Sequence, residues 1–368
     1  MTGRLIVSLA AAGILAGSVP AAADDRPVPA VYVTSADSGT ITAFQIGDGG
    51  TLHRIGYPID GGEDPRGIVV SPDGRTVYVS NNGADRLSVY RVGTDGGLSR
   101  IQYLKGGDDP FGLAVAPDGR ALYVADIGLD TGVSRVMRFP IRADGTLGDG
   151  KAFPTGATHP RGVAVSPDGR FVFVSHGVPM PEAEPGVLTT LAVQSGGSLK
   201  QVHDPVRIGL SGVTIAIPPA AKFLYVGAQA SGQVFGFRIG ADGALTAVPR
   251  SPFDAPGIPE GITATADGTH VYVADEDETI GSVRGFSVAA DGSLTEVGGS
   301  PFIPGNSQVG IAATPDSRFV YSSNGTDNNV AGFSVGDGGT LHPVDRSPFP
   351  TNGLGSAFQS VAVSPPAG

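Results

Sequence analysis

The stretch that decides the fold is residues 65–98, PRGIVVSPDGRTVYVSNNGADRLSVYRVGTDGGL. A short apolar run opens it, then come a Ser-Pro-Asp-Gly turn, a Val-Tyr-Val run, a third apolar run and an Asp-Gly turn with a leucine. The Val-Tyr-Val run recurs around Tyr32, Tyr78, Tyr123, Phe173, Tyr225, Tyr272 and Tyr321. The residue that opens the first run recurs at Gly67, Gly112, Gly162, Thr214, Gly261, Gly310 and Ser360. The unit is therefore about 49 residues long, and four short strands in a unit of this size are typical of a β-propeller blade.

Each unit is expected to contain four antiparallel strands. In the unit quoted above they are 67–71, 76–80, 86–92 and a strand that begins near Leu98. The first is almost uniformly apolar, as a strand buried on both faces should be. The third alternates apolar and polar residues, which predicts one wetter face. With 57 Gly and 30 Pro, the composition favours many tight turns and disfavours long helices.

The two ends of the chain are partial units that complete one another. The stretch 359–365 matches only a first strand, whereas 31–33 matches only a second strand and 41–46 the third. Pairing the two ends in one blade would remove the open edge of the ring. Six whole units and this composite blade predict an all-β, seven-bladed propeller of four-stranded antiparallel blades.

Residues 1–23 carry the pattern of a secretory signal peptide. Arg4 precedes an apolar stretch from Leu5 to Val19, and small residues form a cleavage site near Ala23. We expect a short linker at 24–29 and the propeller at 30–368, secreted to the extracellular space or the periplasm. A retained N-terminal anchor is the alternative, although the apolar stretch is short for a membrane span.

Composition excludes several functional classes. The chain has no cysteine, so disulfides, thiolate metal sites and a cysteine nucleophile are ruled out. Its net charge of −11 works against nucleic acid or an anionic membrane as partner. The sequence contains no GxSxG, P-loop or HExxH motif. We expect a monomer without membrane insertion, because a closed ring leaves no sheet edge that needs a partner.

The uniform turns and the variable loops should lie on opposite faces of the disc. Turn chemistry explains the Pro-Asp-Gly and Asp-Gly turns, which are nearly the same in every unit. The loops that follow the second strands vary in length and polarity, and binding groups concentrate on loops held by a rigid scaffold. We therefore expect the functional site on the loop face, at the mouth of the central channel.

Two circles of polar side chains are predicted at this mouth. The residues around the start of each first strand should lie nearest the axis, and they include Asp64, Arg66, Asp109, His159, Arg161, Glu260 and Gln308. The residues at the ends of the second strands form the other circle, with Asn81, Asp126, His176, Gln229, Asp275 and Asn324. Arginines would grip carboxylate or phosphate oxygens, and histidine or glutamate could move a proton. The alternative is that these groups only solvate the rim of a water-filled channel.

The repeated motifs resemble those of the lactonase-type seven-bladed propellers, a family related to 6-phosphogluconolactonase, 3-carboxymuconate cyclase and the YVTN-repeat surface proteins. The Ser-Pro-Asp-Gly-Arg turns, the Val-Tyr-Val runs, the Asp-Gly-x-Leu turns and the Ser-Pro-Phe motifs at 251–253, 300–302 and 347–349 carry the likeness. It covers residues 30–366. These motifs belong to the scaffold, so they indicate the fold more than an activity.

The resemblance implies only part of a catalytic site. The family's Pro-Arg-His segment keeps its Pro-Arg at 160–161 and 65–66, but glycine follows both. The segments 175–177 and 274–276 lack the Asn-Glu and Asn-Arg-Gly-His signatures expected after second strands. The resemblance thus carries over Arg161, while the family's histidine and glutamate have no counterpart.

The resemblance favours a lactonase-like hydrolase or cyclase that acts on a small anionic lactone. In this hypothesis Arg161 and Arg66 orient the substrate, and His159 or Glu260 is the acid–base group. The other residues of the two circles would bind the substrate. The alternative is a non-catalytic binding propeller of the YVTN type, which would hold a protein, polysaccharide or cell-envelope ligand on its variable face. The sequence leaves open whether the protein is an enzyme.

No cofactor is expected. The acidic run 275–278, with Glu260 before the same unit, offers hard carboxylate oxygens to Ca²⁺ but lacks the spacing of an EF-type loop. Six scattered histidines without a short-spaced pair disfavour a histidine-based metal site. We interpret the acidic run as solvated charge, with calcium as the alternative.

Overall fold

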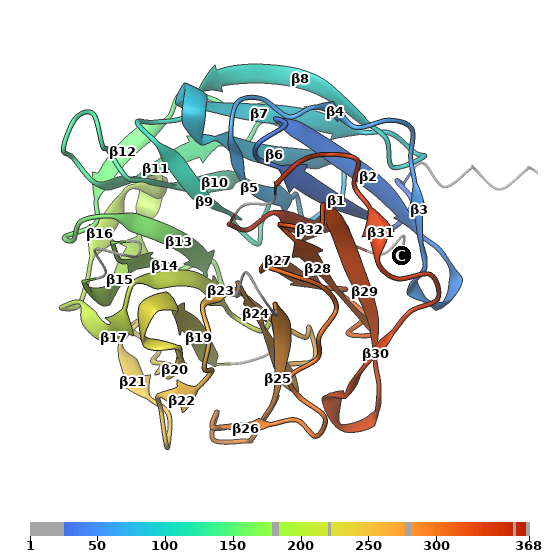
Figure 1. Cartoon of the computed structure of the whole chain (residues 1–368). Coiled ribbons are helices and arrows are strands. Elements are labelled where there is room, and N and C mark those ends of the chain that lie inside the picture. Colours follow the sequence, from blue (N-terminus) through green and yellow to red (C-terminus); the bar gives the residue numbers. More distant parts are fainter. Residues whose placement is uncertain (1–25, 179–183, 220–221, 277–280, 356–357, 366–368) are drawn as a thin grey trace, which may run out of the picture.

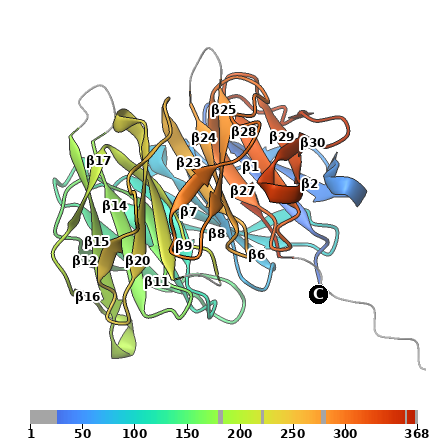
Figure 2. The ribbon, with the colours of Figure 1, turned by 90° about the horizontal axis from the view of Figure 1, so that it is seen from below.

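Seven antiparallel sheets are arranged as blades around a central axis in the computed structural model (Figure 1). It describes residues 26–178, 184–219, 222–276, 281–355 and 358–365. Turned by 90°, the ring is seen with the strands running between its two faces (Figure 2). The predicted signal peptide at 1–23 and the acidic residues 277–278 lie outside the described residues. Within the described ranges, no helix has the length and apolarity needed to cross a membrane.

Six blades follow one another along the chain, each with its strands paired in sequence order. Blade 2 contains β5 (Pro65–Val70), β6 (Thr76–Asn81), β7 (Arg86–Val92) and β8 (Leu98–Lys105), and blade 3 contains β9 (Pro110–Val115), β10 (Ala121–Asp126), β11 (Arg135–Pro140) and β12 (Lys151–Pro154). Blade 4 contains β13 (Pro160–Val165), β14 (Phe171–His176), β15 (Pro185–Val193) and β16 (Leu199–Gln201), and blade 5 contains β18 (Gly212–Ala216), β19 (Phe223–Ala228), β20 (Gln233–Ile239) and β21 (Leu245–Ala247). Blade 6 contains β23 (Pro259–Ala264), β24 (His270–Asp275), β25 (Ser282–Val288) and β26 (Leu294–Glu296), and blade 7 contains β27 (Gln308–Ala313), β28 (Phe319–Asn324), β29 (Asn329–Val335) and β30 (Leu341–Pro343). Four two- to five-residue strands, β4 (Ile59–Asp60), β17 (Val206–Leu210), β22 (Phe253–Asp254) and β31 (Phe349–Pro350), pair with third strands.

Blade 1 is built from both ends of the chain, which confirms the predicted closure. It contains β1 (Ala30–Ser35), β2 (Thr40–Ile46), β3 (Leu52–Arg54) and the C-terminal β32 (Val361–Val363). β1 and β32 are antiparallel, with Val31 opposite Val363 and Val33 opposite Val361. The backbone N–H of Ala30 also donates to Ser364 Oγ at 2.8 Å. The ring is therefore closed by hydrogen bonds between the two chain ends.

The wetter face predicted for the third strand is absent in blade 2, and that expectation is wrong. Residues 87–90 of β7 are all buried, whereas the residues of β8 are half-buried or exposed throughout. Each blade packs both of its faces against neighbouring blades, so the third strand still lies inside the ring. The polar exposure falls on the fourth, outermost strand.

The repeated tyrosine joins five of the seven blades to the next blade. The hydroxyl of Tyr225 in blade 5 donates to the carbonyl oxygen of Gly292 in blade 6 at 2.8 Å. The same bond is made by four more pairs, Tyr32–Gly96, Tyr78–Gly145, Tyr272–Gly339 and Tyr321–Gly50. The accepting glycine has a positive φ in the turn before the fourth strand, which glycine adopts without strain. The Val-Tyr-Val run and the glycine turn therefore recur together because they form one contact between blades.

We expect Tyr225→Phe to lower the free energy of unfolding by about 1–2 kcal/mol, because the carbonyl of Gly292 loses its partner in a buried contact. Urea denaturation of both proteins measures the difference. Phe173 occupies the equivalent position in blade 4, so the ring accommodates the substitution. Tyr57→Phe is the matched control, because that ring is 85% exposed and its substitution should leave the midpoint unchanged. Equal midpoints for Tyr225→Phe and the wild type would refute the contact.

Candidate functional site at the mouth of the central channel

The inner strands carry a bulge where they begin, at the loop face. In β5, β13 and β23 the pairing with the second strand skips one residue, which is Arg66, Arg161 and Glu260 respectively. A bulge re-aims the side chain of the skipped residue. Phe111 occupies the corresponding position in β9, where the register also shifts. The bulges therefore present a guanidinium, an aromatic ring, a second guanidinium and a carboxyl group from equivalent places on four blades.

The glycine that follows each bulge marks the closest approach of neighbouring inner strands. A Cβ on Gly162 would lie 2.5 Å from the carbonyl oxygen of Val213 in the next blade. A Cβ on Gly112 or Gly261 would lie 2.3 or 2.4 Å from a backbone oxygen of the following blade. These distances are too short for any side chain. The histidine that the resemblance would place after Pro160-Arg161 therefore has no room at Gly162.

Arg161, Gln229 and Glu260 form a buried cluster that joins blades 4, 5 and 6. Arg161 Nη1 donates to Gln229 Oε1 at 3.0 Å, and Nη2 donates to Glu260 Oε1 at 3.4 Å. Gln229 Nε2 donates to Glu260 Oε2 at 2.6 Å. The three residues are only 5%, 7% and 4% exposed. Two residues predicted for catalysis, Arg161 and Glu260, are thus brought together, and Gln229 completes the group.

Two aromatic rings lie beside the guanidinium of Arg161. Its Cζ lies 5.4 Å from the ring centroids of both Phe111 and Phe358, and the two centroids are 4.6 Å apart. Nε of Arg161 is buried without a hydrogen-bond partner among the described residues. A channel of about 330 Å³ is lined mainly by the apolar inner strands, and its lining includes the residues that directly follow Arg161, Glu260 and Phe358. The cluster and the rings therefore occupy one end of that channel.

Burial raises the pKa of the Glu260 carboxyl above its usual range, although the nearby guanidinium groups of Arg161 and Arg66 oppose this shift. A carboxyl group with a raised pKa beside a cation at the end of a channel is a candidate acid–base group. The same features also occur in purely structural ion pairs. Chemistry at Glu260 therefore needs a direct test of activity.

Arg66 is the accessible arginine of the mouth. Its side chain is 37% exposed, and its Nε lies 2.9 Å from the Asp64 carboxylate. His159 is half-buried and has a left-handed backbone, with a φ of 53°. Its backbone N–H donates to Ser134 Oγ at 3.0 Å, and the ring atom Nδ1 is buried without a partner within the described chain. The structure therefore places Arg66 near Glu260, while His159 makes no hydrogen bond to the buried cluster within the described chain.

Four of the residues at the ends of the second strands turn toward the loop that leads into their own blade. Asn81 Nδ2 donates to Gly61 O at 2.5 Å, and Asp126 Oδ1 accepts from Asp108 N at 2.6 Å. Equivalent bonds join Asp275 to Ile258 N and His176 to Thr158 O, while Asn324 bonds Asn329 and Gln308 accepts from Ser322. All of these strand-end side chains are buried. Their hydrogen bonds hold loops, and contact with a substrate stays a prediction for each of them.

The pKa of His176 predicts a pH-dependent loss of stability. Burial lowers this pKa from 6.5 to about 4, and the ring lies between Thr158 O and Thr189 Oγ1 at 3.0 and 3.1 Å. The unfolded chain binds the proton more tightly than the folded protein does. The contribution of the neutral His176 to the free energy of unfolding is therefore complete above pH 6.5, and it is lost as the pH falls toward about 4. The wild type should lose about 3 kcal/mol more than His176→Asn between pH 7 and pH 4.

Asparagine is the matched replacement because Asn81 and Asn324 occupy the same position in blades 2 and 7. The unfolding free energy of both proteins, measured by urea denaturation across this pH range, gives the difference. Parallel pH profiles would show that His176 is not the titrating group.

Gln359 and the two phenylalanines of the mouth were missed by sequence reasoning. The Gln359 side-chain amide accepts from Leu113 N and donates to Leu113 O, both at 3.0 Å, and so connects the strand leading into β32 with blade 3. The signal that could have found Gln359 and Phe111 is the column just before the repeated glycine. That column contains Arg66, Phe111, Arg161, Val213, Glu260, Val309 and Gln359.

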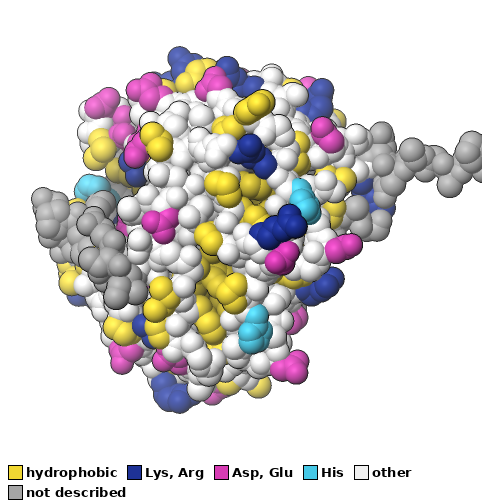
Figure 3. Space-filling model, turned by 45° about the vertical axis from the view of Figure 1, so that its right-hand side comes forward, with side chains coloured by type: hydrophobic (Ala, Val, Ile, Leu, Met, Phe, Trp, Pro, Cys, Tyr) yellow, Lys and Arg dark blue, Asp and Glu magenta, His cyan; other side chains and the backbone are white. Residues whose placement is uncertain are grey.

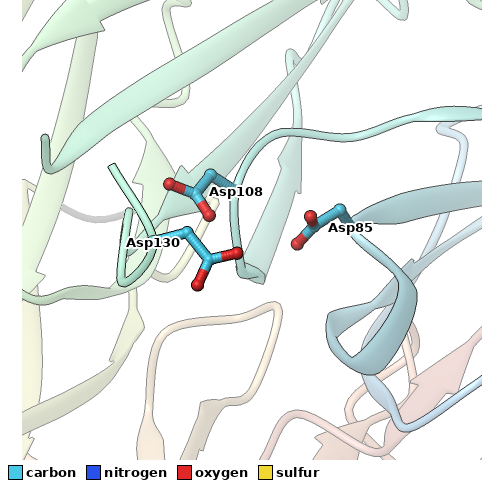
Figure 4. Close-up of side chains that lie close together, drawn as sticks. All are labelled: Asp85, Asp108 and Asp130. Carbon is cyan, nitrogen blue, oxygen red and sulfur yellow. The ribbon is translucent and has the colours of Figure 1, made fainter. Parts of the chain in front are cut away.

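A group of three carboxylates lies next to Asp126, on the loops of blades 2 and 3 (Figure 4). Ligand oxygens of Asp85, Asp108 and Asp130 lie within 4.8 Å of one another, a spacing that could hold a hard divalent cation. Hydrogen bonds from Thr131 lower the pKa of Asp108, one of them from its N–H at 2.8 Å. Three separate segments supply the group, so no local motif predicted it. Calcium at 275–278 stays a prediction, and Asp275 uses its carboxylate on its own loop.

A profile of the family described as lactonase, 7-bladed beta-propeller, matches residues 28–111, 102–178 and 267–353. The chain belongs to this lactonase family. The matched ranges include Arg66, His159 and Arg161, whereas the stretch that supplies Gln229 and Glu260 lies between them and is not matched. The buried cluster thus combines a residue from the part that matches the family with two from a part that does not.

Solved structures show the same fold at low identity. A protein assigned as a 6-phosphogluconolactonase of Bacteroides uniformis is 20% identical, with a TM-score of 0.74 over 91% of this chain and 99% of its own. A second, from Bacteroides fragilis, is 18% identical with a TM-score of 0.72 over 94% and 99%. The periplasmic gluconolactonase of Pseudomonas aeruginosa is 21% identical with a TM-score of 0.69 over 91% and 99%. No curated protein matches the chain. At these identities the structural likeness shows the fold alone.

Proposed function

We propose that this lactonase-family protein hydrolyses a small anionic lactone at the channel mouth. The observation that carries the proposal is Glu260, a carboxyl group with a raised pKa that lies beside Arg161 at the end of the channel. Arg66, at the equivalent bulge of blade 2, supplies a solvent-accessible guanidinium nearby. Family membership supports the same reaction class.

Glu260 would act as the general base in this reaction. It takes a proton from water as the water oxygen adds to the lactone carbonyl carbon. Collapse of the tetrahedral intermediate breaks the ring C–O bond, and the departing oxygen takes up a proton to give the hydroxy acid. A guanidinium group can stabilise the negative charge that develops on the carbonyl oxygen. His159 is the proposed donor of the proton to the departing oxygen, since its Nδ1 has no partner in the described part of the chain.

The burial of the two arginines assigns them different tasks in the proposal. Arg161 is 5% exposed and bonds Gln229 and Glu260, so it would position the carboxyl group rather than grip the substrate. Arg66 is accessible and bonded only to Asp64 among its described neighbours, so it would hold the substrate anion. This differs from the sequence-based hypothesis, in which both arginines orient the substrate.

Hydrolysis of a panel of γ- and δ-lactones tests the proposal. The panel pairs each carboxylate-bearing lactone with its neutral analogue, and proton release at constant pH measures turnover. We expect the anionic member of a pair to be the better substrate because Arg66 is accessible. The absence of turnover for every lactone would overturn the enzymatic function.

A non-catalytic binding propeller is the second candidate. It is favoured by the burial of the Arg161–Gln229–Glu260 cluster, whose members already hydrogen-bond one another. The links and loops on the mouth face also expose Leu129, Ile303 and Leu354 at 64%, 65% and 59%. In the space-filling view of Figure 3, hydrophobic side chains gather near the centre of the visible surface. A protein, polysaccharide or cell-envelope ligand would bind this face, and a protein inactive on all lactones would favour this candidate.

We further propose that the protein is exported and monomeric. Sequencing the N-terminus of the exported protein tests cleavage near Ala23, and light scattering tests the monomer. An uncleaved N-terminus or a stable oligomer would contradict these expectations.

A further inference from the structure

A second cavity lies between blades 2 and 3 on the face of the turns, opposite the channel mouth. It has a volume of about 740 Å³. Its walls come from the β5–β6, β9–β10 and β11–β12 turns and from the end of β7. Four arginines line it, and they are Arg75, Arg91, Arg120 and Arg142. Neither the repeat nor the site at the mouth requires this concentration of guanidinium groups.

Blades 2 and 3, which border the cavity, lack an aromatic residue at the start of the second strand. In blades 4, 5 and 7 that position is Phe171, Phe223 and Phe319, and an arginine guanidinium lies over each ring at 5.0, 4.8 and 5.1 Å. Blades 2 and 3 carry Thr76 and Ala121 instead. The smaller side chains give the arginines beside them no ring to stack on.

The arginines of the cavity correspond in position to the stacked ones. Arg75 and Arg120 follow the same Asp-Gly turn as Arg170 in blade 4. Arg91 lies opposite Thr76 as Arg238 lies opposite Phe223. Blades 4 and 5 thus provide a natural reference for what these arginines do when an aromatic ring is present.

Three of the four guanidinium groups have no partner among the residues that the structure describes. The side chains of Arg75, Arg91 and Arg120 make no hydrogen bond or ion pair there, whereas Arg142 donates to Leu147 O and to Thr146 Oγ1. In contrast, Arg170 and Arg318 lie 3.6 and 3.9 Å from the carboxylates of Asp168 and Asp316. The guanidinium groups of these three arginines are therefore available to bind a ligand.

The acidic side chains of the cavity are bonded within their own turns. Asp73 Oδ1 accepts from Ser71 Oγ at 2.5 Å and from the backbone N–H of Arg75 at 3.1 Å. Asp118 accepts from the backbone of Arg120 at 3.0 Å, and Asp144 from Thr146 N and Oγ1 at 3.0 and 2.6 Å. The cavity thus has four arginines against three aspartates, a formal excess of one positive charge.

We propose that this cavity binds an oxyanion of the phosphate class, either free or carried by a small molecule. A guanidinium fork matches phosphate geometry with two parallel hydrogen bonds, and several free forks suit a ligand with more than one negative charge. The volume lies in the range of small-molecule sites, about 300–1,000 Å³, and leaves room for more than a phosphate group. Binding here is independent of the reaction proposed at the mouth.

Calorimetric titration of the full chain at constant ionic strength tests the proposal. The ligands are inorganic phosphate, pyrophosphate and phenyl phosphate, with acetate as the monovalent control. We expect binding of pyrophosphate, weaker binding of phosphate and none of acetate. Phenyl phosphate that binds more tightly than phosphate would indicate a carried group, and the reverse order would indicate the free ion.

Two double variants make the test specific to the cavity. Arg91→Gln/Arg120→Gln should weaken pyrophosphate binding at least about tenfold, because each charged hydrogen bond contributes to affinity. Arg170→Gln/Arg238→Gln removes the same charge beside Phe171 and Phe223 and should leave the affinity unchanged. No binding by the wild type, equal affinity in the first variant, or equal losses in both variants would overturn the site. Melting temperatures of both variants show that the ring is intact.

Discussion

Arg161→Ala is expected to lower the free energy of unfolding by about 3–5 kcal/mol, the cost of removing one partner from a buried ion pair. The substitution leaves the Glu260 carboxylate, at 4% exposure, without its cation. It also removes the donor to Gln229 and the cation beside the rings of Phe111 and Phe358. Urea denaturation followed by circular dichroism measures the loss.

Arg66→Ala is the matched control, because Arg66 occupies the equivalent bulge in blade 2. Its side chain is 37% exposed and pairs with Asp64, so the loss should stay below about 1 kcal/mol. Adding Glu260→Gln to Arg161→Ala should recover part of the stability, since a neutral amide replaces the stranded charge. A loss for Arg161→Ala no larger than for Arg66→Ala would show that the buried pair does not stabilise this protein.

Glu260→Gln is expected to lower turnover of the best lactone by about a hundredfold to ten-thousandfold, the usual contribution of a general acid–base group. The amide keeps the shape of the side chain and can still accept from Arg161, so the ring should stay folded. Glu296→Gln makes the same change on the outer strand of the same blade, where the carboxylate pairs with Arg284, and should leave turnover unchanged. More than a tenth of wild-type turnover in Glu260→Gln would exclude Glu260 as the base.

The pH profile of turnover gives a second readout of the same residue. The pKa of Glu260 is raised, mainly by burial, and a general base must be ionised to act. Turnover should therefore rise with pH through a range above the ordinary glutamate pKa of about 4.3 and then level off. The residual turnover of Glu260→Gln should lack this rise. An acid limb at the ordinary glutamate pKa would contradict the assignment.

Much of the scaffold could be predicted because its causes are local or periodic. The unit length and the partial units at the two ends predicted the blades and the closure, and the pairing of β1 with β32 confirms both. The tyrosines and the turn glycines were recognised as repeats, but their hydrogen bonds run from one blade to the next. A residue-by-residue pattern does not reveal such a bond, because its partners lie 67 residues apart.

The sequence repeat does not predict the directions of the side chains at the channel mouth. Asn81, Asp126 and His176 were expected beside Arg66 and Arg161, yet they hydrogen-bond the loops of their own blades. Their neighbour in the column, Gln229, reaches Glu260 instead. The direction of each side chain depends on where the strand register shifts and on the path of the incoming loop.

The sevenfold repetition of the pattern seen at 65–98, with the partial units at the two ends, determined the all-β ring, its seven blades and the face on which variable residues gather. Only the tertiary structure decided which of those residues meet, because the inner strands of different blades converge at the axis. That convergence buries Arg161 with Gln229 and Glu260 from two other blades and leaves Arg66 accessible. At the junction of blades 2 and 3, four arginines face a cavity whose second strands begin without the aromatic ring found in blades 4, 5 and 7. The repetition along the chain determines the fold, and the contacts between blades determine which functional side chains lie together.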